Sequence, residues 1–507
     1  MGNATMRHAR RLSALCLAIL CFTLTPGGGA TAAGCAAGVN DTVKKLLSCI
    51  RGPELWRHLS HFQAIADAHP DALGHGDRDT GTAGYRASVD YVAHLMRRAG
   101  YDVTVQPYIW KHNEIVETPS FRGPDGAYRL SRDWFMASLS GSGSVAGPAT
   151  PAEGDGTGCA ARDFARFPRG GIALLQRGTC DFDTQVGNAE RAGADGVVLY
   201  NSAAASDEPG RGPRRDGGAF PAPLTEFAQV PVAGVISHAL GTALAGRTVQ
   251  IDIRTRPKSD TDYNLIADSP FGDANHIVVV DGHLDAIYGA GMLDNASGST
   301  TMLDIALAMA KTPTRNRLRY IWFGGEELGL LGSHYYTRHL KAAELRRIVF
   351  DVDVDVTATP NFDVLVADPR YAHDVSRFPP NVVPDSKIGN RLFATYFRSI
   401  GIPAQNARFG NDGTDSNSFS LVGVPNTGIL TNQDCCKHAW EVKIWGGFLG
   451  NYEGKIPGFN GGCVDQPHRW CDNLFNNDPL VLEFVSKAVA YVTFKLANDR
   501  ALDGQGK

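Results

Sequence analysis

The sequence HIVVVDGHLDAIYGAGMLDNASG occupies residues 276–298. It opens with an apolar run of the length of a buried strand, and acids, one imidazole and a glycine-rich turn follow. The residues after Asp294 have the pattern of a helix, so the stretch predicts a strand, a turn and a helix in succession. Ligands of open α/β sheets bind beyond the carboxyl ends of the strands. His283, Asp285 and Asp294 are therefore candidates for a functional site.

The same succession of strand and helix continues along the chain. Strands are predicted at residues 276–282, 318–324, 347–356 and 426–431, and helices at residues 297–311, 329–340, 388–401 and 479–497. Such alternation predicts an α/β fold with a mostly parallel, mixed sheet sandwiched by helices.

The part of the chain before this region divides in two. Residues 35–131 carry two helical patterns and one strand pattern, and we expect them to be the N-terminal part of the main domain, which continues over residues 255–500. Residues 132–254 begin with a Gly- and Pro-rich segment and then alternate strand and helix. We interpret them as an inserted β-rich α/β domain with a binding or lid role, or as a structural spacer.

The N-terminus has the pattern of an export signal. A basic segment precedes an apolar stretch at residues 12–24 that is too short to span a bilayer, and small residues before position 33 suit cleavage after Ala32. We predict that residues 1–32 are a signal peptide and that the protein is secreted, periplasmic or part of the cell envelope. The alternative is a lipoprotein attached to the membrane through Cys35.

Cysteine usage fits export, because disulfides persist in oxidising compartments. Eight of the ten cysteines follow the predicted signal and form local pairs: Cys35 with Cys49, Cys159 with Cys180, Cys435 with Cys436, and Cys463 with Cys471. The formal net charge of −4 shows no excess of basic residues, so nucleic acid is not an expected partner.

Adjacent acids follow the predicted strand at 318–324. Glu326 and Glu327 would repel each other if both were buried, and a metal ion relieves this by taking one of them as a ligand. The other then has a raised pKa, as a general base needs. The alternative is a solvated acidic turn.

Asp residues alternate with Val at residues 351–355, so Asp351, Asp353 and Asp355 share one face of a strand. Three charges on a buried face are costly. The acid nearest the carboxyl end, Asp355, is the one expected to reach the site, with Asp353 as the fallback. The other interpretation is a strand at the edge of the sheet whose Asp-bearing face is exposed to solvent.

A last imidazole, His468, lies in a loop between Cys463 and Cys471. Together with the acids it completes a mixed nitrogen and oxygen set that suits two zinc-like ions bridged by one carboxylate. Two such ions activate a water and polarise a carbonyl.

These motifs resemble the co-catalytic di-zinc aminopeptidase family, which includes secreted bacterial aminopeptidases and, more distantly, glutamate carboxypeptidase. The resemblance rests on GHLDA and GMLDNASG, then GGEELGLLGS, DVTATPN and HRWCDNL. The segment GGIALLQRGTCDFDTQVGNAERAGADGVVLYN resembles the protease-associated domain that many members carry as an insert.

The resemblance implies a role for each candidate. Glu326 is the general base and Asp285 orients His283. The implied ligands of two zinc ions are His283 and Asp355 on the first, Glu327 and His468 on the second, and Asp294 between them.

The chain departs from the family at one point. Many members have Tyr just before the last His, where it stabilises the oxyanion, and this sequence has Pro467. Asp415 lies where the family has an acid near the site, although a helix cap is the simpler interpretation.

The function implied by the resemblance is an exported di-zinc aminopeptidase that acts on the N-termini of peptides or proteins. A carboxypeptidase or dipeptidase on the same scaffold is one alternative, and a non-catalytic binding protein of the same fold is another. A serine hydrolase and a zincin are disfavoured, because the sequence has neither a GxSxG nor an HExxH motif.

Overall fold

The computed structural model describes residues 35, 37–71, 74–130, 132–202, 219, 222–287, 289–372, 374–407, 413–433, 437–453, 471–500 and 502. The predicted signal peptide, Cys435, Cys436, Cys463, Pro467 and His468 lie outside these residues. Among the helices within them, none has the length and apolar character needed to cross a membrane.

Thirteen strands in the described residues are joined by hydrogen bonds, in the order β12-β11-β13-β10-β8-β9-β7-β3-β4-β5-β6, with β1 beside β7 and β2 beside β1. The main lobe contains β8 (Asp273–His283), β9 (Asn316–Phe323), β10 (Ile348–Val354), β11 (Leu365–Ala367), β12 (Gln405–Ala407) and β13 (Asn426–Leu430). Strands β13, β10, β8 and β9 are parallel, whereas β11 and β7 run antiparallel to their neighbours β13 and β9. The predicted mixed, mostly parallel sheet is confirmed.

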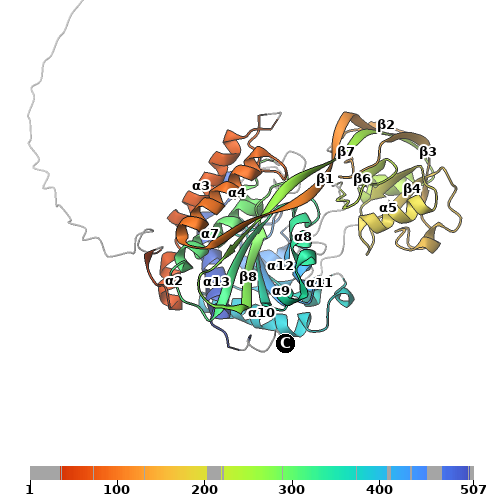
Figure 1. Cartoon of the computed structure of the whole chain (residues 1–507). Helices are drawn as coiled ribbons and strands as arrows, with labels where there is room; N and C mark the ends of the chain where they lie inside the picture. The colour runs from red at the N-terminus through yellow and green to blue at the C-terminus, as the bar shows by residue number, and fades with distance from the viewer. Residues whose placement is uncertain are drawn as a thin grey trace, which may run out of the picture.

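Helices cover both faces of this sheet (Figure 1). One face carries α2 (Val43–Cys49), α3 (Gly52–Ala68), α4 (Ala83–Ala99), α7 (Ser297–Met309), α10 (Val382–Ser399) and α13 (Pro479–Ala497). The other face carries α8 (Leu331–His339) and α11 (Ser416–Leu421). The short helices α9 (Ala342–Leu345) and α12 (Ala439–Trp445) complete the main lobe.

The central strands alternate between the two cores. In β8, Val278 and Val280 belong to the core under α7 and α13, whereas Ile277 and Val279 belong to the core under α8 and α11. Successive side chains of a strand point to opposite faces, so this run is buried on both sides. The polar residues that follow it reach the edge of the sheet where the strand ends.

A long two-stranded ribbon connects the main lobe to a second lobe (Figure 1). It consists of β1 (Asp102–Gly123) paired antiparallel with β7 (Thr248–Asp268). The second lobe adds β2 (Gly126–Tyr128), β3 (Gly143–Pro151), β4 (Ile172–Gln176), β5 (Gly196–Tyr200), β6 (Val232–Ile236), α5 (Phe182–Arg191) and α6 (His238–Leu244). The predicted boundary between residues 254 and 255 falls inside β7, so the chain passes between the lobes within a strand rather than in a loop.

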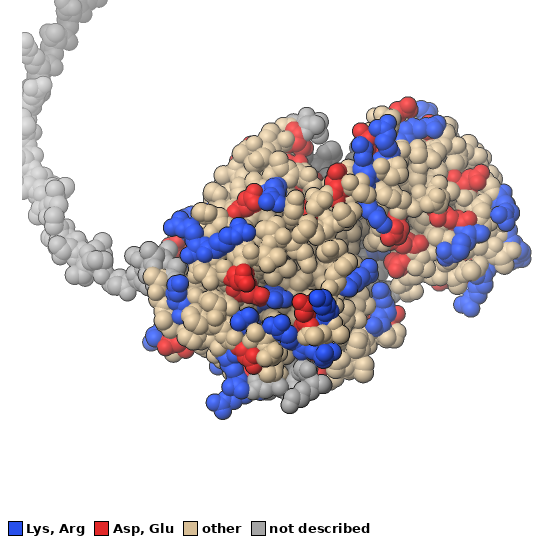
Figure 2. Space-filling view, in the orientation of Figure 1, with Lys and Arg blue, Asp and Glu red and all other residues tan. Residues whose placement is uncertain are grey.

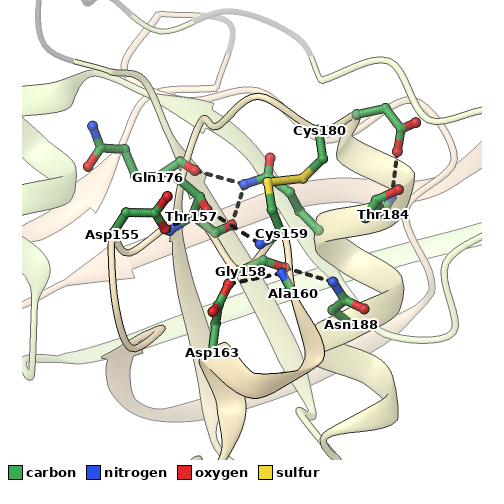
Figure 3. Close-up of a disulfide and its surroundings, with 12 residues drawn as sticks. Asp155, Thr157, Gly158, Cys159, Ala160, Asp163, Gln176, Cys180, Thr184 and Asn188 are labelled. Atoms are coloured by element: carbon green, nitrogen blue, oxygen red, sulfur yellow. Dashed lines mark hydrogen bonds between the residues drawn. A yellow bond between two sulfur atoms is a disulfide. The ribbon is translucent and has the colours of Figure 1, made fainter. Parts of the chain in front are cut away.

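Two of the predicted disulfides are confirmed, Cys35–Cys49 and Cys159–Cys180. Figure 3 shows the second of them beside α5. Asn188 of this helix donates to the main-chain oxygen of Gly158 at 2.9 Å, and Asp163 accepts from the amide of Ala160 at 2.9 Å. The disulfide therefore joins two segments that already contact each other. The other two predicted pairings involve residues outside the described part and stay predictions.

We expect removal of the Cys159–Cys180 disulfide to destabilise the second lobe. The bond closes a loop of 21 residues. Its loss raises the conformational entropy of the unfolded chain and thereby lowers the free energy of unfolding by about 2–3 kcal/mol. Urea denaturation of the Cys159→Ser/Cys180→Ser protein, compared with the wild type, measures the change. An unchanged midpoint would contradict the expectation.

Candidate metal centre and active site

Three potential metal ligands converge at the carboxyl end of the sheet. His283 is the last residue of β8, Asp294 lies in the turn Met292–Ala296 before α7, and Asp355 directly follows β10. Their ligand atoms lie within 4.8 Å of one another. His283 Nε2 is 2.9 Å from Asp294 Oδ1 and 3.3 Å from Asp355 Oδ1. An imidazole nitrogen and two carboxylate oxygens at one point suit a divalent cation.

The orientation of His283 leaves Nε2 available to a cation. Its Nδ1 lies 3.0 Å from the main-chain oxygen of Asp285, which can only accept, so Nδ1 donates. In the neutral ring this places the lone pair on Nε2. We expected the carboxylate of Asp285 to take this proton, but its Oδ1 is farther away, at 3.6 Å.

The Asp285 carboxylate connects three segments of the site. It is buried and accepts from Thr80 Oγ1 at 2.8 Å and from the backbone N–H of Glu326 at 3.3 Å. It therefore holds the Glu326 loop against the end of β8. It lies close enough to His283 to favour the charged ring electrostatically.

Glu326 points toward the same centre from the end of β9. Its Oε2 lies 4.0 Å from His283 Nε2. The chain turns at Gly324 and Gly325, and a Cβ at Gly324 would come within 2.3 Å of the Tyr85 hydroxyl. Only glycine fits there, so the close packing of Tyr85 fixes where the loop leaves the strand.

Burial and neighbouring charges shift the pKa values of Glu326 and His283. Burial raises the pKa of Glu326 well above its usual range, the neighbouring carboxylate of Glu327 raises it further, and His283 opposes the shift. Burial by itself lowers the pKa of His283, but the surrounding acids outweigh it and raise that pKa well above its usual range. The centre is thus a buried place of excess negative charge, which is what a cation requires.

The other acids of the sheet do not join this group. Strand β10 is central and buried, so the interpretation of a solvent-exposed edge strand is wrong. Asp353 accepts the backbone N–H of Ser416 at 3.1 Å and thereby holds the start of α11. Burial raises the pKa of Asp351 well above its usual range and that of Asp353 to about 7. Burial and the repulsion from neighbouring carboxylates therefore both favour the protonated forms of Asp351 and Asp353.

Asp415 is not the helix cap that we expected. It occupies the N-cap position of α11, but its side chain makes no capping hydrogen bond. The carboxylate is fully buried, and burial together with Asp353 raises its pKa well above the usual range.

Glu327 is half-buried on the Glu326 loop and is not among the three converging ligands. Its predicted partner, His468, lies outside the described residues. The second metal position therefore stays a prediction.

Comparison with known proteins identifies the family. A model of peptidase family M28 matches residues 264–492, and a PA-domain model matches residues 145–244. An aminopeptidase of Pseudomonas aeruginosa (strain UCBPP-PA14) is 31% identical over 460 residues, covering 88% of this chain and 81% of the relative. The chain belongs to peptidase family M28. The predicted family and its protease-associated insert are both confirmed.

A further relative and two solved structures are also similar to this chain. A probable lipoprotein aminopeptidase, LpqL, of Mycobacterium tuberculosis is 28% identical over 459 residues, 87% of this chain and 84% of the relative. An aminopeptidase from Aneurinibacillus sp. strain AM-1 has a TM-score of 0.66 at 19% identity over 90% of this chain and 96% of its own. BSAP, a zinc aminopeptidase from Bacillus subtilis, has a TM-score of 0.57 at 21% identity, covering 89% and 96%. These structures share the fold of this M28 peptidase.

Two residues that support the site of this M28 peptidase were not found from the sequence. The first is Asp472, which is fully buried and follows Cys471. Its Oδ1 accepts the backbone N–H of Leu293 at 2.8 Å, and its Oδ2 accepts that of Asp294 at 3.1 Å. The carboxylate therefore holds the backbone of a predicted ligand. Its position four residues after His468 was visible in the sequence, but its partners were not.

The second is Arg78, whose guanidinium is fully buried. It donates to the main-chain oxygens of Leu284, Ala290 and Gly291, at 2.5, 2.6 and 3.2 Å. These carbonyls belong to the loop that runs from His283 to Asp294. Nothing in the sequence around Arg78 indicates this distant contact.

We expect Asp472→Asn to lower the affinity for a divalent metal by about 10–100-fold. Asn has one carbonyl oxygen and so cannot accept from two amides with two oxygens. Zinc titration against a competing chelator measures the change. Asp181→Asn, which alters a cap of α5 in the second lobe, is the matched control and is expected to bind zinc like the wild type. Equal affinities for the two variants would rule out the positioning role of Asp472.

Proposed function

We propose that this M28 peptidase is an exported, zinc-dependent aminopeptidase. The observation that carries the proposal is the convergence of His283, Asp294 and Asp355 with the Glu326 carboxylate beside them. The aminopeptidase relatives described above support the reaction class. Peptide or protein N-termini are then the substrates.

The residues present fit zinc. His283, Asp294 and Asp355 would hold one ion, and Glu327 and His468 would hold a second that shares Asp294. Zinc, when bound, lowers the pKa of a water molecule and polarises the carbonyl of the peptide bond.

Glu326 is the general base in this proposal. Its carboxylate takes a proton from the attacking water and passes it to the amine that leaves. The raised pKa of Glu326 suits the uptake of a proton from water, because a carboxylate of low pKa would accept that proton poorly. Asp285 acts indirectly: its carboxylate holds the Glu326 backbone, and its main-chain oxygen accepts from His283 Nδ1.

Export is supported by the disulfides, which persist in oxidising compartments. The Cys35–Cys49 bond also bears on membrane attachment. A lipid would require the Cys35 thiol, and the disulfide uses it. We therefore favour a secreted or periplasmic protein over the lipoprotein alternative.

Metal removal tests the proposal. We expect chelation to abolish hydrolysis of leucine amide and added zinc to restore it, with the metal content measured in parallel. Activity that survives complete metal removal would refute the zinc mechanism. Cleavage of N-acetylated peptides without cleavage of free-amine peptides would identify a carboxypeptidase instead. Binding of peptides by the zinc-loaded protein without cleavage would identify a non-catalytic member.

A further inference from the structure

A pocket of about 330 Å³ lies where the two lobes meet. The ribbon strand β1 supplies Ile109 and Trp110, and the second lobe supplies Leu139 and Leu224. The main lobe supplies Leu328, from the loop after Glu327, and Leu331, the first residue of α8. Its apolar lining thus comes from both lobes and from the ribbon between them. Figure 1 shows this ribbon crossing from one lobe to the other.

The pocket adjoins the active site by two independent routes. The first is the Glu326 loop, where the backbone N–H groups of Gly329 and Leu330 donate to the main-chain oxygen of Glu326 at 2.9 and 2.8 Å. This turn therefore joins Glu326 to Leu328 and Leu331, which line the pocket. A Cβ at Gly329 would lie 3.7 Å from Thr225 of the second lobe.

The second route passes through Trp110. Its ring packs onto Gly81 so closely that a Cβ there would come within 2.0 Å of it. The neighbouring Thr80 donates to Asp285, which holds the Glu326 loop. One wall of the pocket is therefore two residues from the polar network of the site.

The Lys and His side chains at the pocket are already paired, whereas the Asn113 Oδ1 atom is buried without a hydrogen-bond partner among the described residues. Lys111 Nζ contacts Glu226 at 2.6 Å, and His112 Nε2 contacts Asp260 at 2.7 Å. Figure 2 likewise shows Lys and Arg mixed with Asp and Glu over the visible face, without a large area of one sign. The pocket thus offers an apolar occupant a favourable environment and a charged one no unpaired counter-charge.

The wall from the second lobe is held in place. Asp183 of α5 accepts from the amide of Thr225 at 3.1 and 3.0 Å and from the amide of Glu226 at 3.1 Å. Leu224 donates its amide to Ser138 Oγ at 2.8 Å. The loop that carries Leu224 is therefore positioned before any ligand arrives, as is usual for small-ligand sites.

We propose that this pocket binds an apolar side chain of the substrate on the leaving side of the cleaved bond, the second residue of the peptide. The inference rests on the proposed aminopeptidase function. Glu326 must deliver a proton to the leaving amine, so the leaving residue lies on the Glu326 side of the site. Leu328 and Leu331, which follow Glu326 in the chain, line the pocket, so we place the pocket on that side. The second lobe then has a direct part in substrate selection.

Dipeptide amides test the proposal. We expect the wild type to hydrolyse Leu-Phe-amide with a kcat/KM about 10–100-fold above that for Leu-Gly-amide, because the pocket removes the second side chain from water. Leu224→Ser is expected to reduce this ratio about tenfold. Ile115→Ser, at an exposed apolar position of β1 outside the pocket, is the control and is expected to keep the ratio.

A second variant does not depend on the fold tolerating a change at the buried Leu224. Ile109 is 63% exposed at the rim of the pocket. Ile109→Asp is expected to shift the preference several-fold from Leu-Phe-amide toward Leu-Lys-amide.

Three results would overturn the inference. Equal wild-type rates for Phe and Gly at the second position would do so while leaving the aminopeptidase function intact. So would a Leu224→Ser protein that loses discrimination between Leu-Gly-amide and Gly-Gly-amide instead, since the pocket would then serve the first residue. Failure of the zinc-loaded wild type to cleave any of these amides would refute the proposed function and the inference together.

Discussion

Replacement of Glu326 by Gln is expected to lower kcat by about 10²–10⁴-fold with little change in metal content. Gln has the shape of Glu but accepts no proton from water and delivers none to the leaving amine. Glu326 is absent from the group of converging ligand atoms, so its substitution leaves those ligands in place. Steady-state kinetics on leucine amide and zinc analysis of the same preparations measure the two quantities.

The pH profile adds a readout that a purely structural role would not change. Wild-type activity is expected to fall as the pH decreases through the pKa of Glu326, because the protonated acid cannot act as a base. The residual activity of Glu326→Gln is expected to lack this acid limb. Glu117→Gln, at an exposed position on β1, is the control and should behave like the wild type. A Glu326→Gln protein with wild-type kcat would remove Glu326 from the mechanism.

The convergence of His283, Asp294 and Asp355 could be predicted because these candidate residues follow local patterns of the sequence. His283, Glu326 and Asp355 each come at or just after the end of an apolar run, and parallel strands bring those ends to one edge of the sheet. The alternation of Asp and Val placed Asp351, Asp353 and Asp355 in order along one face. Strand periodicity predicted that Asp355 lies nearest the carboxyl end of the strand, and Asp355 is the acid beside His283.

The supporting residues could not be predicted in the same way. Arg78 and the carbonyls that it contacts are about two hundred positions apart. Asp472 contacts Leu293 and Asp294 over a similar separation. Their side chains bind backbone groups, which every residue offers, so no pairing of residue types marks the contact. The strand pattern in the N-terminal part covers residues 101–110, only the first part of β1. The rest of β1 was missed because the ribbon beyond Trp110 is mostly exposed and lacks an apolar alternation.

The largest effect on stability is expected from Arg78→Met. Met fills much of the same volume but donates no hydrogen bonds, so the buried oxygens of Leu284, Ala290 and Gly291 lose a donor. Each unsatisfied buried group costs about 1–3 kcal/mol, and relief of the cost of burying the guanidinium offsets part of this. We expect the free energy of unfolding to fall by about 3–5 kcal/mol. Urea denaturation measures it.

Arg78 also holds the loop between two proposed metal ligands, His283 and Asp294, so its loss should weaken zinc binding as well as folding. The backbone reinforces this contact, because the Arg78 amide donates to Gly289 at 2.9 Å and the Ala286 amide donates to Arg78 at 3.2 Å. Burial lowers the pKa of Arg78 to about 10, which keeps the group charged at neutral pH.

Arg78→Lys separates charge from geometry. It keeps the positive charge, but an ammonium group lacks the planar fork that reaches carbonyls on two sides, so we expect it to recover only part of the lost stability. Arg97→Met, at an exposed position of α4, is expected to change stability by no more than about 0.5 kcal/mol. If Arg78→Met unfolded at the wild-type urea concentration and bound zinc with wild-type affinity, the Arg78 side chain would not be what holds the loop from His283 to Asp294. The contacts of Asp79 with the Gly289 amide and of Asp472 with the Leu293 and Asp294 amides would then suffice.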